Sequence, residues 1–356
     1  MVGRVLITNK YRQLPEGKPT GSNEIFCWNV RGLGSMRAVR RLQHMLKIYH
    51  PQIVFFMETK LNANRMERVR RRYGFFNGID VSAKGSRGGL SLGWNGGHLV
   101  RVKSFSENHI DVEIQEDEEK PRWRFTGFYG APKVRNKAET WALLRRLGEN
   151  NSLPWLVGGD FNVILCAHEK KGGLPMEEAR MEAFRRTLED CLLEDIGFLG
   201  PWFTWERGRI LERNIRERID RCVATGSWSQ TFLNYSLRHL SHSFSDHCPL
   251  LAETEDGRKR SNTSRFRFES WWVLEESCEK EVKKLWKECS GPYLNRMTTL
   301  AQGLKAWAGR MQFNHKELKD EERSEENLVE LSEVKLHLNM EMDKEERYWE
   351  QRARVN

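Results

Sequence analysis

Trp155-Leu156-Val157-Gly158-Gly159-Asp160-Phe161-Asn162 is the most informative stretch of this sequence. Its apolar residues and glycines predict a buried strand whose carboxyl end carries an acid and an amide. Side chains two residues apart on an extended chain point to the same side, so Asp160 and Asn162 are expected to face one site. An apolar run that leads to polar side chains recurs elsewhere in the chain.

The related stretches are Trp28-Asn29-Val30, Glu58-Thr59-Lys60, Arg218-Ile219-Asp220 and Ser245-Asp246-His247. No single one is specific, but their order along one chain is hard to explain as an accident. In α/β proteins, sites gather beyond the carboxyl ends of strands. Together the five stretches predict an active site that cuts phosphodiester bonds.

Alternating strand and helix patterns over the first 253 residues predict a layered α/β or α+β fold. Helical faces are expected around Val39, Leu42 and Leu46, and around Met181, Phe184 and Leu188. Strands are expected at 25–30, 53–57, 90–94, 110–114, 123–129, 155–158 and 219–223.

Composition excludes several classes of protein. No apolar stretch approaches the roughly 20 residues of a membrane helix, so a membrane protein is not indicated. Residues 1–22 lack the apolar core of a signal peptide and are expected to form a flexible leader. The seven cysteines are scattered without Cys-x-x-Cys, which favours reduced thiols in an intracellular protein and argues against a structural zinc site.

Positive charge is concentrated in the first part of the chain. The whole chain has 59 Lys and Arg against 50 Asp and Glu, and residues 254–356 have 20 against 21. Residues 1–253 therefore carry 39 against 29, a net charge of +10. Such a surface suits a polyanionic substrate such as nucleic acid, although a basic surface that only aids solubility remains open. Residues 254–356 are predicted to form an appended α-helical region, with Leu328, Leu331, Val334 and Leu338 on one stripe.

Hydrolysis of a phosphodiester at neutral pH calls for a divalent ion and a positioned water. Glu58, directly after five apolar residues, is the first expected ligand, and Asp246 is the second. Asp160 is expected to align or deprotonate water, with Asn162 binding a phosphate oxygen. His247 needs a carboxylate partner to hold its proton, and Asp220 is the candidate.

Asn29 and Tyr129 end two further strands and are expected to contact the metal or the phosphate. Nucleophilic alternatives are weaker. Ser245 lies near His247 but lacks a Gly-x-Ser-x-Gly elbow, and no cysteine has the surroundings of a catalytic thiol.

Across about residues 23–253 these motifs resemble the endonuclease/exonuclease/phosphatase superfamily. The resemblance implies a four-layer α/β sandwich of two packed mixed sheets with outer helices, followed here by the C-terminal α-helical extension. It also implies one magnesium-dependent site, with manganese as a possible substitute. The matching residues are, for the metal, Glu58, Asn29 and Asp246, and for catalysis Asp160, His247, Asp220, Asn162 and Tyr129.

Finer motifs resemble the endonuclease of plant-type non-LTR (LINE) retrotransposons. They are Trp28-Asn-Val-Arg-Gly-Leu-Gly, Phe128-Tyr-Gly, Glu169-Lys-Lys-Gly-Gly, Phe203-Thr-Trp and Ser245-Asp-His-Cys-Pro-Leu. Tyr348-Trp-Glu-Gln-Arg-Ala-Arg resembles the segment that leads into the reverse transcriptase in such polyproteins. The resemblance implies a truncated polyprotein: a leader (1–22), a nicking domain (23–253) and a helical linker (254–356). An active protein is expected in the nucleus.

Arg31 departs from the apurinic endonucleases of the superfamily, which usually have an acid at this position. The departure disfavours abasic-site repair and favours nicking of ordinary DNA, with Arg31, Arg87, Trp202 and Trp205 as expected DNA contacts. Two alternatives remain open. One is a phosphatase or phospholipase of the same superfamily, and the other is a non-catalytic relic that binds nucleic acid or a partner.

Overall fold

The computed structural model describes residues 6–8, 22–95, 99–115, 119–149, 151–208, 210–242, 244–255 and 276–288, together with single helical residues between 296 and 340. The chain divides into two compact units. The first comprises residues 1–208 and 212–258 and holds all the strands in the described part of the chain. The second comprises residues 209–211 and 259–356, and its longest described helix is α6 (Glu276–Glu288).

The larger sheet of the first unit has seven strands in the order β1-β4-β5-β3-β2-β16-β15. Only β2 and β3 run parallel, which brings the carboxyl ends of both to one edge, with Asn29 beside Met57. The strands are β1 (Leu6–Thr8), β2 (Ser22–Asn29), β3 (Ile53–Met57), β4 (Asn77–Val81), β5 (Leu90–Trp94), β15 (Ser236–His239) and β16 (Leu250–Glu255).

A second sheet has six strands in the order β11-β14-β9-β8-β7-β6, of which only β8 and β9 run parallel. They are β6 (Leu99–Phe105), β7 (His109–Gln115), β8 (Trp123–Tyr129), β9 (Trp155–Asp160), β11 (Leu193–Asp195) and β14 (Asp220–Thr225). A small third sheet consists of β10 (Lys170–Lys171), β13 (Ile215–Glu217) and β12 (Trp205–Arg207).

The alternation of side chains along the strands explains why the two large sheets pack face to face. On β3, Phe55 lies in the core between the sheets, whereas Val54 and Phe56 belong to the core under the helices. Both faces of the strand are buried, which is why its sequence is apolar throughout. The sheets approach so closely that a Cβ at Gly127 would lie 2.4 Å from the ring of Phe55.

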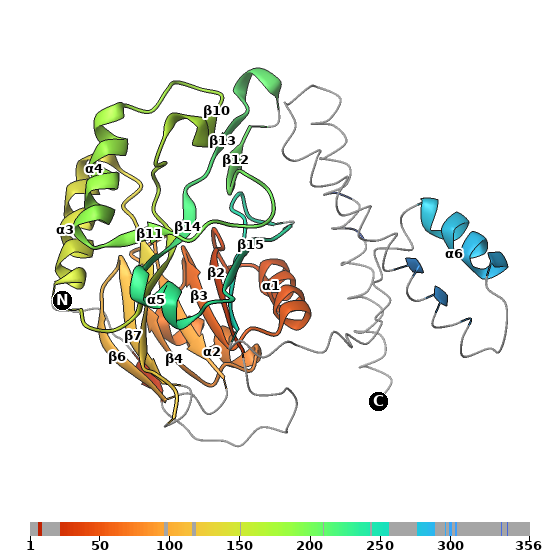
Figure 1. Cartoon of the computed structure of the whole chain (residues 1–356), viewed down its shortest axis with the longest axis horizontal. Coiled ribbons are helices and arrows are strands. Elements are labelled where there is room, and N and C mark those ends of the chain that lie inside the picture. Colours follow the sequence, from red (N-terminus) through yellow and green to blue (C-terminus); the bar gives the residue numbers. More distant parts are fainter. Residues whose placement is uncertain are drawn as a thin grey trace. The chain divides into compact units, whose positions relative to one another are not determined.

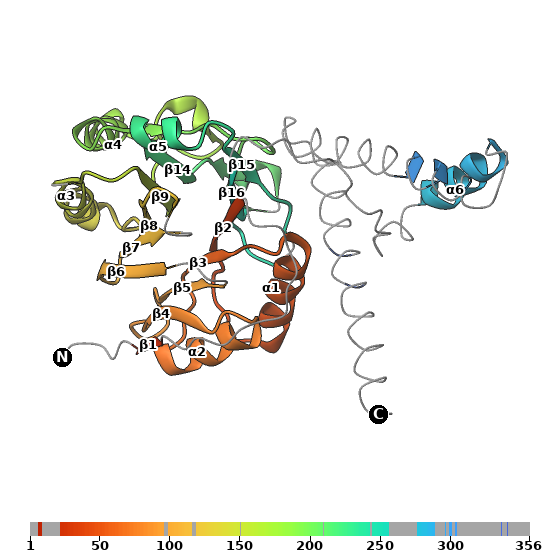
Figure 2. The same ribbon diagram turned by 60° about the horizontal axis from the view of Figure 1, so that its bottom comes forward.

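Helices cover the outer faces of both sheets (Figure 1), and Figure 2 shows α1 and α2 on one side and α3 and α4 on the other. The side chain of Ser35 caps the start of α1, and His50, with a left-handed φ of 47°, ends it. The helices are α1 (Met36–Tyr49), α2 (Ala63–Arg72), α3 (Lys137–Gly148), α4 (Glu178–Asp190) and α5 (Gly226–Thr231). The result is the expected four-layer α/β sandwich of two mixed sheets with outer helices.

All seven predicted strands and both predicted helical faces are confirmed. Within the predicted leader, Leu6–Thr8 form β1 and pair with β4, and β2 begins at Ser22. The stripe of Leu328, Leu331, Val334 and Leu338 lies outside the described residues, and the domain boundary after residue 253 stays a prediction. Among the described residues, no helix is both long and apolar enough to span a bilayer.

Candidate active site

Polar side chains from the two large sheets meet where their strands end. Asp160, the last residue of β9, is the register partner of Tyr129 on β8 and of Asp220 on β14. The other sheet supplies Asn29 at the end of β2 and Glu58 directly after β3. Hydrogen bonds of side-chain donors cross between the sheets, since Asn29 Nδ2 donates to Asp160 Oδ2 at 2.9 Å and the Tyr129 hydroxyl donates to Glu58 Oε1 at 2.6 Å. The structure therefore brings these predicted residues together.

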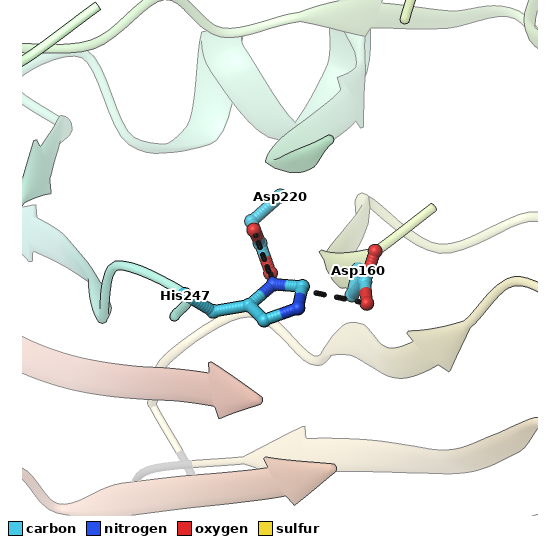
Figure 3. A group of neighbouring side chains, drawn as sticks. All are labelled: Asp160, Asp220 and His247. Carbon is cyan, nitrogen blue, oxygen red and sulfur yellow. Dashed lines mark hydrogen bonds and ion pairs between the residues drawn. The ribbon is translucent and has the colours of Figure 1, made fainter. Parts of the chain in front are cut away.

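His247 lies between two buried carboxylates (Figure 3). Its Nδ1 is 2.9 Å from Asp220 Oδ2 and 3.9 Å from Asp160 Oδ2. Burial alone would lower the pKa of His247, but the charges of Asp220 and Asp160 outweigh burial and raise that pKa to about 9. The imidazole is therefore protonated at neutral pH and suited to donate to a phosphate oxygen.

Asp160 is fully buried and surrounded by amide donors. Its Oδ1 accepts the backbone N–H of Asn162 at 2.8 Å, and its Oδ2 accepts the side-chain amides of Asn162 and Asn29 at 2.9 Å each. Burial and the neighbouring Asp220 raise the pKa of Asp160 to about 7, although His247 and the amides oppose the rise. A carboxylate with a pKa near neutrality is suited to accept a proton from water.

Glu58 and Asp246 present the more open carboxylates, with side chains 12% and 26% exposed. Both contact one guanidinium, that of Arg31, whose Nη1 is 3.3 Å from Glu58 Oε2 and whose Nε is 3.0 Å from Asp246 Oδ1. Two carboxylates that already converge on a cation fit Mg²⁺, which prefers oxygen ligands, takes few carboxylates and keeps several waters. Trp205 Nε1 donates to the second oxygen of Asp246 at 3.0 Å and holds it in place.

A second set of metal-ligand type is formed by Asp160, Asp220 and His247, whose ligand atoms all lie within 4.8 Å of one another. Distance alone would allow an ion there. However, a protonated imidazole has no lone pair to give, and both oxygens of Asp160 already accept hydrogen bonds. These features suit the buried trio to proton transfer and the Glu58 and Asp246 pair to a divalent ion.

Ser245 fixes the turn that carries His247. Its hydroxyl donates to the carbonyl of Asn29 at 2.7 Å and accepts the backbone N–H of His247 at 3.1 Å. Trp28 Nε1 donates to the carbonyl of His247 at 2.8 Å. The hydroxyl of Ser245 is thus used for structure, in agreement with the prediction that it is not a nucleophile.

A profile of the endonuclease/exonuclease/phosphatase family matches residues 26–247, a span that contains all the site residues described above. The chain belongs to this family. A search of curated proteins returned no match.

Solved structures of similar fold include nucleases. The AP endonuclease LMAP from Leishmania major is 16% identical, with a TM-score of 0.54 over 70% of this chain and 93% of its own. The 3'-5' exonuclease NExo from Neisseria meningitidis is 18% identical, with a TM-score of 0.52 over 65% and 100%. The endonuclease domain of TRAS1, a telomere-specific non-LTR retrotransposon, is 14% identical, with a TM-score of 0.48 over 66% and 98%. At these identities the first two comparisons establish the fold.

Behind the site of this family member lies a buried ion network that the sequence interpretation missed. Glu169 accepts from Arg218 Nη1 and Arg221 Nη2 at 2.7 Å each, and Asp195 accepts from both arginines at 2.9 Å. Burial alone would raise the pKa of Glu169, but the two guanidinium groups lower it. Because Arg218 and Arg221 flank Asp220 in sequence, the network fixes the strand that positions it. In the sequence, the alternation of acidic and basic residues around residue 220 is the signal that could have predicted this network.

Lys137 is a second missed residue. Its buried Nζ donates to the carbonyls of Phe161 and Asn162 at 2.9 and 2.7 Å, and burial lowers its pKa to about 7. It holds the turn after Asp160, where Asn162 has a left-handed φ of 55°. The pattern around residue 137 resembles an ordinary helix start, so no sequence signal marked it.

The expected DNA contacts occupy different surroundings. Arg87 is exposed in a loop whose next residue, Gly88, accepts the backbone N–H of Lys60 at 3.0 Å. Trp202 is 39% exposed, whereas Trp205 is partly buried through its bond to Asp246. Contacts of these side chains and of Arg31 with DNA stay predictions.

Proposed function

We propose that this chain is a magnesium-dependent DNA endonuclease that nicks one strand and leaves a 3'-hydroxyl. The observation that carries the proposal is the division of the site into a buried proton-transfer trio and an open pair of carboxylates. Asp160 accepts a proton from water, which attacks phosphorus, while the bond from phosphorus to the 3' oxygen breaks and this oxygen takes a proton from solvent. His247 donates through Nε2 to a phosphate oxygen, and Asp220 holds the imidazolium through Nδ1.

Glu58 and Asp246 would hold the divalent ion, which when bound neutralises charge on the phosphate and supports the leaving oxygen. Tyr129 fixes the Glu58 carboxylate through its hydroxyl. Asn29 and Asn162 orient Asp160 through their side-chain amides. These residues come from the ends of β2, β3, β8 and β9 and from the loop between β15 and β16, so the packed sheets preset the geometry before substrate arrives.

Charge and sequence motifs support DNA as the substrate and a retroelement as the source of the chain. The net charge of +10 on residues 1–253 favours a polyanion over a small phosphoester. The motifs from Trp28 to Leu250 resemble plant-type non-LTR retrotransposon endonucleases, whose nick provides a primer for a reverse transcriptase. We therefore propose that the chain acts in the nucleus beside such a polymerase.

A nicking assay on supercoiled plasmid with Mg²⁺ tests this proposal. Glu58→Ala and Asp160→Ala are expected to abolish the conversion to open circles. Glu113→Ala is the matched control for Glu58→Ala. Like Glu58, Glu113 is a largely buried glutamate, 13% exposed, that pairs with a lysine and an arginine, but it lies on β7 and outside the site. Equal nicking by all four proteins would refute the assignment. Release of inorganic phosphate from inositol phosphates without nicking would establish a phosphatase instead.

A further inference from the structure

Arg31 occupies the position between the two carboxylates that we assign to the divalent ion. Nε contacts Asp246 Oδ1 at 3.0 Å, and Nη1 lies 3.3 and 3.4 Å from the two oxygens of Glu58. The side chain of Arg31 is 46% exposed, so one side of the guanidinium faces solvent. Lys60 is the other cation at this place, with Nζ 3.6 Å from Glu58 Oε2.

The backbone directs Arg31 to this position. Arg31 has a left-handed φ of 51°, which is unfavourable for a residue with a long side chain. Its N–H donates to Asn29 Oδ1 at 3.2 Å, and the flanking Val30 and Leu33 donate to the carbonyls of Met57 and Thr59. The turn is therefore tied to the two residues on either side of Glu58.

We propose that Arg31 is a resident counter-ion of the site, which releases Glu58 and Asp246 to a divalent ion and then binds the substrate phosphate. This inference rests on the proposed function. The same carboxylate oxygens cannot contact the guanidinium and a metal ion at full strength, and two cations at this distance repel each other. Because the Arg31 side chain is 46% exposed, water screens its ion pairs with Glu58 and Asp246, and the exchange is energetically accessible.

Two consequences follow from this exchange. First, Arg31 weakens the apparent affinity for metal, because only molecules with the ion pair broken can bind it. Secondly, metal binding releases the guanidinium of Arg31 from the two carboxylates, so that it can form charge-assisted hydrogen bonds with a phosphate of the substrate. Metal and DNA therefore strengthen each other's binding, and Arg31 contributes to this coupling.

Mn²⁺ binding to the full chain, measured by electron paramagnetic resonance of the free ion, tests the first consequence. Arg31→Met is expected to bind Mn²⁺ more tightly than the wild type, by about tenfold where the ion pair is broken in about a tenth of the wild-type molecules. Lys60→Met is the matched control, since it also removes one positive charge beside Glu58 but breaks no bridge to Asp246. Its affinity should rise by a clearly smaller factor.

Equal affinities of the Arg31→Met and Lys60→Met proteins would overturn the inference while leaving the proposed function intact. Absence of Mn²⁺ binding in the wild type, the Arg31→Met protein and a Glu58→Ala protein alike would overturn both. For the coupling, anisotropy of labelled duplex DNA is measured with and without Ca²⁺, which has the same preference for oxygen ligands. Ca²⁺ should strengthen DNA binding by a larger factor in the wild type than in Arg31→Met, and equal factors would contradict the release of Arg31 to phosphate.

Discussion

Asp160 and Asp220 are register partners on the antiparallel strands β9 and β14, so two acids face each other inside the protein. Two buried carboxylates in such proximity would repel each other if both were ionised and alone. The imidazolium of His247, bonded to Asp220 and 3.9 Å from Asp160, offsets their charge. The three groups therefore act as one unit, and removing any member is expected to affect the others.

Asp220→Asn is expected to lower the nicking rate by about a hundredfold or more, the usual contribution of a positioned proton donor. The substitution keeps the shape of the side chain but removes the charge that keeps His247 protonated. Initial rates on supercoiled plasmid measure the effect. Asp190→Asn serves as control, because Asp190 is 54% exposed and pairs only with Arg145 in the described structure. A wild-type rate for the Asp220→Asn protein would contradict the role given to His247.

Tyr129→Phe removes the hydroxyl that donates to Glu58 at 2.6 Å. The nicking rate at limiting Mg²⁺ is expected to fall about tenfold, in line with loss of a hydrogen bond to a charged group. Much of the rate should return at high Mg²⁺, because the metal-binding carboxylate is loosened rather than lost. Tyr73→Phe removes a partly buried hydroxyl that donates to the carbonyl of Val39, and it should lower stability but leave the Mg²⁺ dependence unchanged. Identical Mg²⁺ curves for wild type and Tyr129→Phe would refute this role.

Glu169→Gln is expected to lower the free energy of unfolding by about 3 to 5 kcal/mol, because it leaves Arg218 and Arg221 buried with too little negative charge. Urea denaturation followed by circular dichroism measures the loss. Glu182 also pairs with two arginines, but it lies on the surface of α4 and is 39% exposed. Glu182→Gln should therefore lower the free energy of unfolding by a much smaller amount, because water screens its ion pairs. Similar losses in the two variants would show that burial of the network is unimportant.

Acid is expected to destabilise the fold through His109 and His239. Burial lowers the pKa of both imidazoles to about 4, whereas an unfolded chain titrates near 6.5. Between these pH values the unfolded state binds more protons, so stability falls as the pH decreases from 6.5 towards 4, by about 2 kcal/mol per histidine at pH 5. His247 acts in the opposite sense, since its raised pKa gives stability that is lost as the pH rises through 9.

Melting temperatures at pH 5 and pH 7 test this expectation. In the wild type the His109 ring, held by the hydroxyls of Ser104 and Ser106, has to stay neutral in the folded state. The His109→Asn protein lacks this ring, so it should lose less stability over this pH range than the wild type. His168→Asn, at an exposed position, should behave as the wild type does. An unchanged pH dependence in His109→Asn would contradict the assignment.

Much of the fold and of the candidate site could be predicted because both depend on local patterns. Buried strands such as Ile53–Met57 are apolar on both faces, and polar residues directly after them stand out. The ion network around Glu169 could not be predicted, because its partners are 49 and 52 residues away along the chain. Lys137 was missed for the same reason, since its role depends on the carbonyls of a distant turn. The contact of Arg31 with two acids likewise depends on where three separate strand ends meet.

The hydrogen bonds from Asn29 to Asp160 and from Tyr129 to Glu58 cross between the sheets, so the geometry of the site depends on the alignment of the two layers. A slip of one sheet over the other by about an ångström would separate the proton-transfer residues from the metal-binding ones while leaving both sheets hydrogen-bonded internally. Catalytic competence would then disappear before the secondary structure melts. Substitutions in the apolar core around Phe55 and Gly127 can therefore abolish the proposed nicking activity from a distance, without touching any residue of the site.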